Sequence, residues 1–324
     1  MALMTYAEAG KAALAAEMRA DAGVWALGED LGRGGVFGQY KGLVEAFGQE
    51  RIVDTPISEA TIMGAAVGAA LMGTRPVVEM RFADFALCAV DELVNQAAKA
   101  RYMFGGQGRV PLVVRQPVGM WRSSAAQHSQ SLEGWYAHIP GLVVVCPGTP
   151  ADNYGLLRSA IRSDDPVVYM EHKDMWGVTG EVDEAAAPLP LGVARLARTG
   201  RDLTLVTWSG ALRWVEAALA LLEDGPSVEV IDLRTIYPWD EAMVLASARR
   251  TGRLLIVHEA VETAGFGAEI AAVAGEKLFG ALKAPIRRLA GPRIPIPYSP
   301  ALEAACKIPP ARIAETVEAM VRQA

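Results

Sequence analysis

The sequence predicts an α/β protein with two domains, each built on a parallel β-sheet. Strand-like and helix-like segments alternate along the chain, and this order is typical of parallel strands joined by crossover helices. Several strand-like segments, such as 141–146, are near-continuous apolar runs, as expected for strands buried on both faces of a sheet. With 324 residues, 52% of them hydrophobic, the chain is long enough for roughly two domains.

The first predicted domain opens with a helix at 6–20 and a short strand at 24–28. Its later strands are predicted at short β-branched runs and its helices at longer segments. In chain order these are a helix at 58–72, a strand at 76–80, a helix at 89–104, strands at 111–115 and 141–146, a helix at 151–162 and a strand at 166–170. Because the helix at 58–72 is apolar on most sides, we expect it to be buried.

A change of composition separates the two domains. From Gly177 to Arg198 the chain is rich in Glu, Ala and Pro and has little periodicity, which predicts a linker. We place the first domain at 1–178, the linker at 179–200 and the second domain at 201–324.

The second domain repeats the alternation of strands and helices, and right-handed crossovers predict a second, smaller parallel sheet. Its strands are predicted at 203–208, 228–233, 254–257 and 286–289, its helices at 211–223, 240–250 and 266–279, a proline-rich surface segment at 291–300 and a last helix at 310–323.

Bulk properties exclude several classes of function. The net charge is −6 and no basic run interleaves with aromatic residues, which argues against a nucleic-acid binder. The three cysteines, Cys88, Cys146 and Cys306, form neither metal-type pairs nor a disulfide framework, which favours a reducing cytoplasm. The apolar block at 60–73 falls short of the roughly 18 residues that cross a bilayer, so we expect no membrane span.

One acid stands at the start of the apolar helix, in the segment Asp54-Thr55-Pro56-Ile57-Ser58-Glu59-Ala60. Ser58 is a residue type that caps helices, and an acid such as Glu59 is favoured in a first helical turn by the helix dipole. Since the helix behind it is predicted to be buried, we expect Glu59 to open onto a pocket. The residues alone leave two interpretations, a carboxyl group that binds or does chemistry and a carboxyl group that only caps.

Glycines crowd the segment after the first strand, at positions 28, 32, 34, 35 and 38. A dinucleotide fingerprint requires G-x-G-x-x-G, and here position 37 is Phe. The sequence also has no G-x-x-x-x-G-K-[ST] phosphate loop. We therefore favour a mobile surface loop over one that contacts a ligand.

The four histidines show no metal-type spacing, which argues against a zinc site. His128 lies in a small, polar segment, 119–131, between two predicted strands, and such loops line ligand crevices in parallel sheets. From the residues alone, a solvated or capping histidine is still favoured. Phe82 and Phe85 follow the strand at 76–80, where they suit either a core or a stacking partner for a flat ligand.

Together these segments resemble one family, the beta subunits of the thiamine diphosphate-dependent first component of 2-oxo acid dehydrogenase complexes. The matching blocks run nearly end to end and include LGED at 27–30, DTPISE at 54–59, FADF at 82–85, QHSQ at 127–130 and IDLRT at 231–235. The resemblance implies a transketolase-like pyrimidine-binding domain followed by a transketolase C-terminal-type domain, and a thiamine diphosphate-dependent oxidoreductase.

The resemblance also assigns roles to individual residues. In that family, the acid matching Glu59 hydrogen-bonds the aminopyrimidine ring of the cofactor and activates it. The residue matching Phe85 stacks on that ring, and Glu29 and Ile57 match positions near the cofactor. His128 matches an active-site histidine that assists proton transfer or reductive acylation of the lipoyl group. The resemblance thus favours catalytic roles for Glu59 and His128.

One element of a thiamine enzyme is missing from the sequence. Such enzymes bind the diphosphate through Mg²⁺ held by a Gly-Asp-Gly loop, and this chain has no Gly-Asp-Gly. The resemblance therefore implies half of an active site, completed in an α2β2 heterotetramer by an alpha subunit that holds Mg²⁺ and shares the cofactor.

The family often holds a structural K⁺ ion, largely through backbone carbonyls. The matching positions are Leu112, Ala160, Ile161, Ser163 and Asp165. Ser163 departs from the usual Asp, and Asp165 stands where Asn is common.

The substrate is predicted from resemblance alone. The sequence before His128 is Ala-Ala-Gln, as in pyruvate and acetoin types, rather than the consecutive histidines of branched-chain members. Glu171-His172-Lys173, Cys88 and the segment 279–285 favour acetoin dehydrogenase over pyruvate dehydrogenase. The two-carbon unit would pass to a lipoyl group on an acyltransferase. A pyruvate dehydrogenase beta subunit and a non-catalytic docking subunit remain alternatives, and the missing motif disfavours a stand-alone transketolase.

Overall fold

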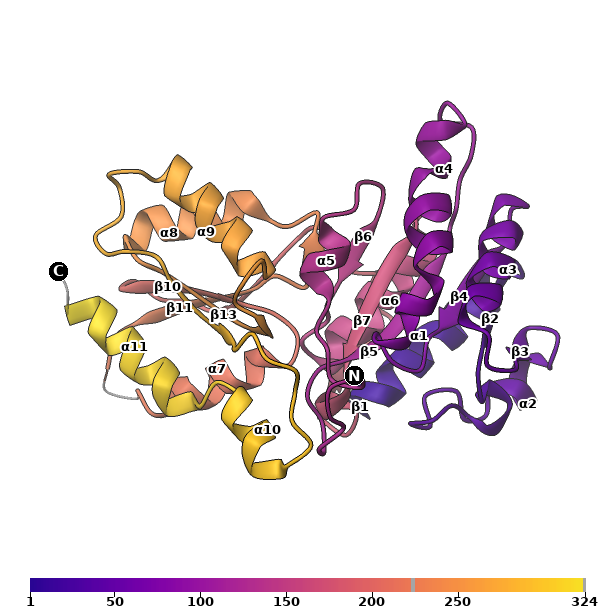
Figure 1. The fold of residues 1–324 in the computed structure, drawn as a ribbon, viewed down its shortest axis with the longest axis horizontal. Coiled ribbons are helices and arrows are strands. Elements are labelled where there is room, and N and C mark those ends of the chain that lie inside the picture. Colours follow the sequence, from indigo (N-terminus) through magenta and orange to yellow (C-terminus); the bar gives the residue numbers. More distant parts are fainter. Residues whose placement is uncertain (223–224, 323–324) are drawn as a thin grey trace. The chain divides into compact units, whose positions relative to one another are not determined.

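The structure, a computed structural model, describes residues 1–222 and 225–322 (Figure 1). The chain divides into two compact units, the first made of Met1–Val118 and Tyr136–Leu191 and the second of Gly119–Trp135 and Gly192–Ala324. Positions 223 and 323, predicted as the last residues of two helices, lie outside the described residues.

The first unit contains a sheet of parallel strands in the order β6-β7-β5-β4-β2-β3. The strands of this sheet are β2 (Val24–Gly28), β3 (Ile52–Asp54), β4 (Arg75–Glu79), β5 (Val113–Val118), β6 (Val143–Val145) and β7 (Val167–His172). Two further strands of the unit, β1 (Ala2–Thr5) and β8 (Thr179–Val182), form a separate pair. The helices of the unit are α1 (Tyr6–Ala20), α2 (Leu43–Phe47), α3 (Glu59–Leu71), α4 (Ala98–Met103) and α6 (Pro150–Arg162), and α5 (Glu133–Ala137) spans a unit boundary in the chain.

The central strands of this sheet, β4, β5 and β7, are buried on both faces, as their apolar sequences predict. Val77 and Val113 belong to the core that also contains α1 and α6, which pack side by side (Figure 1). The next residues, Val78 and Val114, face the other side because side chains alternate along a strand, and they are equally buried. Helix α3 packs against β4.

Helix α3 is less enclosed than its sequence predicts. Ile62, Met63 and Ala66 are buried, but the opposite face, which includes Gly64 and Gly68, is exposed. The prediction that α3 is buried on most sides is therefore wrong for the single chain. A helix that is apolar all round needs a second covering layer, and the described residues do not provide one.

Ser58 immediately precedes α3, but its hydroxyl does not cap the helix. The hydroxyl donates to Thr61 Oγ1 at 2.8 Å, so the expected capping bond to a backbone N–H is wrong.

Two other segments differ from the prediction. The helix predicted at 89–104 is a composite of a 3₁₀ turn at Phe85–Ala89, a π-helical stretch at Asp91–Ala97 and α4. The segment predicted as a linker contains two strands: β8, which pairs antiparallel with β1, and β9 (Arg195–Arg198). Short strands of mixed polarity lack the apolar alternation that identifies strands in sequence.

The second unit contains a smaller sheet in the order β14-β13-β10-β11-β9, parallel except for β9 at its edge. Besides β9, the four strands of this sheet are β10 (Leu203–Thr207), β11 (Val228–Asp232), β13 (Leu254–Val261) and β14 (Arg287–Gly291). The unit also contains the short strand β12 (Thr235–Tyr237) and the helices α7 (Ala211–Ala220), α8 (Glu241–Thr251), α9 (Phe266–Lys277), α10 (Pro300–Cys306) and α11 (Pro310–Arg322). Helices α7 and α11 pack together on one face and α8 and α9 cover the other (Figure 1). The prediction missed β12 and α10 here, and β1, β3, α2 and α5 earlier in the chain.

Candidate active site

Two carboxyl groups meet at the carboxyl ends of β2 and β3, and we call Glu29 and Glu59 the acid pair. Glu29 directly follows β2, and Glu59 is the first residue of α3, which the chain reaches from β3. Glu29 is 8% exposed, and Glu59 is half-buried. Burial raises the pKa of Glu29, the charge of Glu59 raises it further, and Arg81 opposes both. The two carboxyl groups are therefore near enough to compete for a negative charge.

The surface beside the acid pair is suited to a partly apolar ligand. Ile57 is 74% exposed, unusual for an isoleucine. The hydroxyl of Thr55 is buried and has no hydrogen-bond partner among the described residues. The amide of Thr55 donates to the Gly28 carbonyl at 3.0 Å, which fixes the segment against β2. An exposed apolar side chain, an unused hydroxyl and an acid pair fit the aminopyrimidine ring that the resemblance implies.

Phe85 is held by other aromatic side chains. Its ring meets Phe82 edge to face at 5.3 Å between centroids, and the Lys173 ammonium lies 4.7 Å from the Phe82 centroid. The rings of Phe37 and Phe82 also meet edge to face, with 6.2 Å between their centroids. Phe85 is partly buried, and its stacking on a flat ligand stays a prediction.

The glycine-rich segment at 28–38 is anchored by the two residues that follow it. Tyr40 donates its hydroxyl to Glu79 Oε2 at 2.9 Å, and Gln39 donates to Glu79 Oε1 at 3.2 Å. Gly28 approaches β4 so closely that a Cβ there would lie 2.5 Å from the Glu79 carbonyl oxygen. The glycine at this position thus allows close backbone contact, and the interpretation as a simple surface loop is incomplete.

Beneath this loop lies a set of charges that the sequence analysis missed. Arg115 binds Glu171 through two hydrogen bonds of 2.8 Å, and its Nη1 lies 3.6 Å from Glu79 Oε2. We call these three residues the buried ion cluster, since all are at most 3% exposed. Burial, reinforced by the charge of Glu171, raises the pKa of Glu79 to about 7 against the opposing effect of Arg115. The available signal was a charged residue within or at the end of each of three neighbouring apolar strands, β4, β5 and β7.

His128 belongs to the second unit, in the segment 119–131 that we call the His128 loop. The amide of Gly119 donates to the Gln130 carbonyl at 3.4 Å and closes the base of the loop. Three non-glycine residues, Arg122, Ser123 and Ala125, have φ between 47° and 63°. Such conformations cost of order 1–3 kcal/mol each and cluster at functional sites. The structure thus brings Glu29, Ile57 and Glu59 together in the first unit, where Phe85 also lies, while His128 lies on a strained loop of the second.

The five positions predicted to hold a monovalent cation lie at the start of β5 and around the end of α6. Backbone amides already donate to the carbonyl groups of Leu112 and Ala160. The Ser163 hydroxyl donates to the Asp165 carbonyl at 3.0 Å, and the Asp165 carboxylate pairs with Arg101. A carbonyl oxygen has two lone pairs, so these bonds leave one acceptor position on each.

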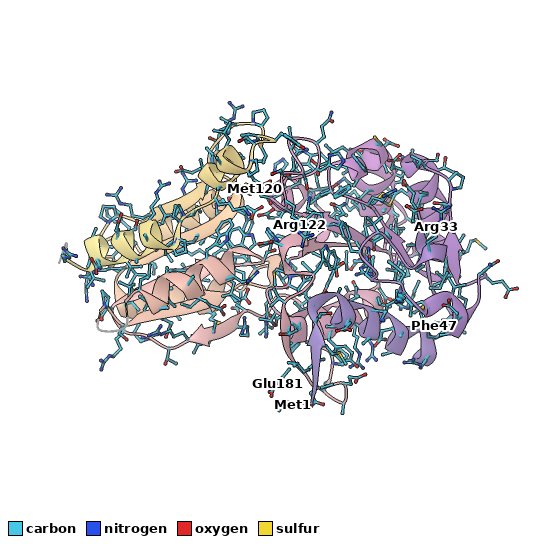
Figure 2. All side chains as sticks on the ribbon, turned by 90° about the horizontal axis from the view of Figure 1, so that it is seen from below. Met1, Arg33, Phe47, Met120, Arg122 and Glu181 are labelled. Atoms are coloured by element: carbon cyan, nitrogen blue, oxygen red, sulfur yellow. The ribbon has the colours of Figure 1, made fainter. Side chains whose placement is uncertain are left out.

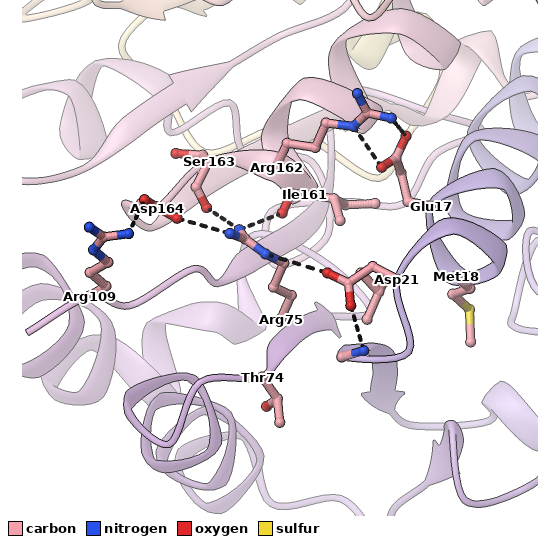
Figure 3. Close-up of polar contacts among 12 residues, drawn as sticks. Glu17, Met18, Asp21, Thr74, Arg75, Arg109, Ile161, Arg162, Ser163 and Asp164 are labelled. Atoms are coloured by element: carbon pink, nitrogen blue, oxygen red, sulfur yellow. Dashed lines mark hydrogen bonds and ion pairs between the residues drawn. The ribbon is translucent and has the colours of Figure 1, made fainter.

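An arginine reaches the remaining carbonyl groups (Figure 3). Arg75 Nη1 donates to the carbonyl oxygens of Ile161 at 3.1 Å and Ser163 at 2.9 Å. Its Nη2 and Arg109 Nη1 bind the two oxygens of Asp164, whose pKa these arginines lower, the hydrogen bond from Arg75 most. The guanidinium groups of Arg75 and Arg109 thus supply the positive charge here. The oxygen atoms at these positions therefore suit a further bound cation poorly.

Within residues 1–222 and 225–322, no three His, Cys, Asp or Glu side chains are grouped as a metal site requires. No helix within these ranges is both long and apolar enough to cross a membrane.

Comparisons with known proteins match the chain to two family models. Residues 2–177 match the transketolase pyrimidine-binding domain, and residues 192–313 match the transketolase C-terminal domain. A solved chain described as "Split gene transketolase, inactive beta4 tetramer" superposes with a TM-score of 0.81, covers 99% of both chains and is 20% identical, which shows the shared fold.

Several curated proteins are similar over most of the chain. The beta subunit of acetoin:2,6-dichlorophenolindophenol oxidoreductase from Cupriavidus necator is 46% identical and covers 89% of this chain and 88% of its own. The 2-oxoisovalerate dehydrogenase subunit beta of Bacillus subtilis is 42% identical over 100% and 99% of the two chains. The pyruvate dehydrogenase E1 component subunit beta of Rhizobium meliloti is 44% identical over 99% of this chain and 70% of its own.

Proposed function

We propose that this chain, which belongs to the family of transketolase-like beta subunits of the thiamine diphosphate-dependent acetoin, pyruvate and 2-oxoisovalerate dehydrogenases, supplies the pyrimidine half of such an active site. The acid pair carries this proposal. Burial and the neighbouring charge of Glu59 raise the pKa of Glu29, so Glu29 retains a proton more readily than a solvated glutamate.

The chain's own residues have distinct tasks in this proposal. Thiamine diphosphate supplies, when bound, a carbon nucleophile and an electron sink. Glu59 shares a proton with a ring nitrogen of the aminopyrimidine, and Glu29 lies beside it with a raised pKa. Phe85 stacks on the ring, and Ile57 covers its apolar edge and excludes water.

His128 is proposed to hold or move a proton as the substrate reacts or as the acyl group leaves for a lipoyl group. The positive φ angles of Arg122, Ser123 and Ala125 support this role. Strained backbone conformations persist only where the surrounding structure enforces them, and they cluster at functional sites.

The missing Gly-Asp-Gly motif supports a partner in the same active site. We propose an α2β2 heterotetramer in which the alpha subunit holds Mg²⁺ and the diphosphate, and an acyltransferase with a lipoyl group as acceptor. Three cysteines without a disulfide support the cytoplasm as its compartment.

The substitution Glu59→Gln tests the assignment. In the complex with the alpha subunit, we expect turnover with an artificial electron acceptor to fall about 100-fold or more, because an amide cannot share the proton. Glu45→Gln is the matched control, an exposed acid in the first turn of α2 that should keep full activity. Full activity of Glu59→Gln would instead favour a non-catalytic docking subunit.

Two further assays refine the proposal. Comparing acetoin with pyruvate in the same complex decides the substrate, and we expect acetoin to give the higher kcat/KM. Activity of this chain without an alpha subunit would contradict the half-site.

A monovalent cation is proposed to bind this chain only weakly. Because Arg75 uses the Ile161 carbonyl, we expect K⁺ to contribute less than about 1 kcal/mol, which corresponds to a rise of under roughly 3 °C in Tm relative to choline at equal ionic strength. A larger, saturable rise would show a strong K⁺ site.

A further inference from the structure

One side chain of the second sheet binds the base of the His128 loop. The amide of Met120, the second residue of the loop, donates to Glu259 Oε1 at 2.6 Å. Glu259 lies on β13, a strand whose preceding residues are fully buried, so it is an anchor on a rigid element. Met120 and Arg122 mark the start of this loop in Figure 2.

The loop lies over a cavity rather than a filled core. A cavity of about 450 Å³ separates loop residues from the end of β13 and the proline-rich segment 292–296. Ser129, next to His128, is 3% exposed, and its hydroxyl has no hydrogen-bond partner among the described residues. Where packing atoms are missing, individual hydrogen bonds fix the position of a segment more than van der Waals contacts do.

A second anchor lies two residues after the loop, at the start of α5. Trp208 Nε1 donates to Glu133 Oε1 at 3.0 Å, and the Trp208 ring stacks on His258 at 5.0 Å between centroids. Burial lowers the pKa of His258 to about 4, so it stays neutral behind the tryptophan at physiological pH. Strained residues 122–125 therefore lie between two fixed points, near residues 120 and 133.

We propose that Glu259 is a positioning residue for His128, an inference that rests on the proposed function of that histidine. By binding Met120 it fixes the base of the loop, where Gly119 pairs with Gln130, two residues after His128. Loss of this bond lets the strained loop relax and displaces the imidazole. A misplacement of about 1 Å of a catalytic group costs on the order of 100-fold in rate.

The test uses the assembled enzyme and two activities, reduction of an artificial electron acceptor and acylation of a lipoyl domain. We expect Glu259→Ala to lower kcat about tenfold to 100-fold in whichever activity His128→Ala lowers, with KM changed less than threefold. Glu259→Gln keeps an oxygen that accepts from Met120 and should restore kcat to within about threefold of the wild type. Glu262→Ala, which removes an exposed acid just after β13, is the control and should match the wild type.

A second readout does not depend on activity. Trypsin cleaves after Arg122 within the loop, and we expect Glu259→Ala to accelerate this cut severalfold at an unchanged Tm, while Glu259→Gln does not. Wild-type kcat and wild-type cleavage in Glu259→Ala would overturn the inference alone, provided that His128→Ala is impaired. If His128→Ala retains both activities, the proposed role of the histidine fails and this inference fails with it.

Discussion

In the buried ion cluster of the first unit, Arg115 lies between Glu79 and Glu171, whereas the acid pair Glu29 and Glu59 lies at an open edge of the same sheet. The cluster is enclosed within one chain, with two hydrogen bonds from Arg115 to Glu171 and two more from the loop to Glu79. In the acid pair, the nearest ion-pair contact of Glu29 is with Arg81, at 3.7 Å.

The difference supports a structural role for the buried ion cluster and the binding role that we propose for the acid pair. A buried charge must find its partners within the fold, because an unpaired one costs several kcal/mol. The acid pair is only partly compensated, and an exposed isoleucine and an unused hydroxyl lie beside it. Incomplete satisfaction at a half-open edge is what a site retains for a molecule that arrives later.

The largest expected effect comes from removing the arginine of the cluster. Arg115→Met leaves two buried carboxyl groups without their cation, and we expect the free energy of unfolding to fall by about 3–5 kcal/mol, measured by chemical denaturation. Arg33→Ala is the control, since that arginine is exposed and should change stability by less than about 0.5 kcal/mol. A loss below about 1 kcal/mol in Arg115→Met would remove the structural side of the comparison.

Most strands of both sheets were predictable because their apolar runs are local signals, but the short edge strands β3 and β9 were not. The helix at 6–20 was predicted with the bounds that α1 has, since a capping box and an amphipathic pattern both define it. The pairing of β1 with β8 was not predictable, because it joins segments far apart in the chain and neither is strongly apolar. The exposed face of α3 was not predictable either. An apolar composition indicates that a helix is covered, but it does not show what covers it.

The candidate site was predictable only in part. Glu59 stood out from the sequence as an acid before an apolar helix, but its role came from the resemblance. Arg115 was missed because it ends an apolar run, where a single charge looks like the end of a strand. The role of Glu259 depends on a contact between β13 and a loop about 140 residues earlier, and no local pattern reports such a contact.

A smaller effect concerns pH and again contrasts the two carboxylate sites. The pKa of Glu79 is raised from 4.5 to about 7, so the folded chain keeps a proton that the unfolded chain releases. Its contribution to stability is present below pH 4.5 and is lost as the pH rises through 7. Relative to Glu79→Gln, wild-type stability should therefore decline by about 2–3 kcal/mol between pH 5 and pH 8.

The comparison with Glu79→Gln is needed because His258 acts in the opposite direction. Its pKa is lowered to about 4, so its contribution to stability is lost as the pH falls below 6.5. The glutamine variant keeps His258, and the difference between the two proteins isolates Glu79. Parallel pH profiles for the two proteins would mean that Glu79 is ionised throughout and fully compensated by Arg115.

The smallest expected effect tests the open side of the comparison. Ile57 is 74% exposed, so Ile57→Ala should change stability by less than about 0.5 kcal/mol. In the complex with an alpha subunit, it should weaken thiamine diphosphate binding by about tenfold, because burying an isoleucine contributes roughly 1.5–3 kcal/mol and alanine retains part of it. Leu3→Ala is the matched control, since Leu3 has the same exposure on β1, and calorimetric titration of both variants measures the difference. Equal affinities would mean that this isoleucine contacts the partner subunit rather than the cofactor, and the open edge would then be an interface before it is a binding site.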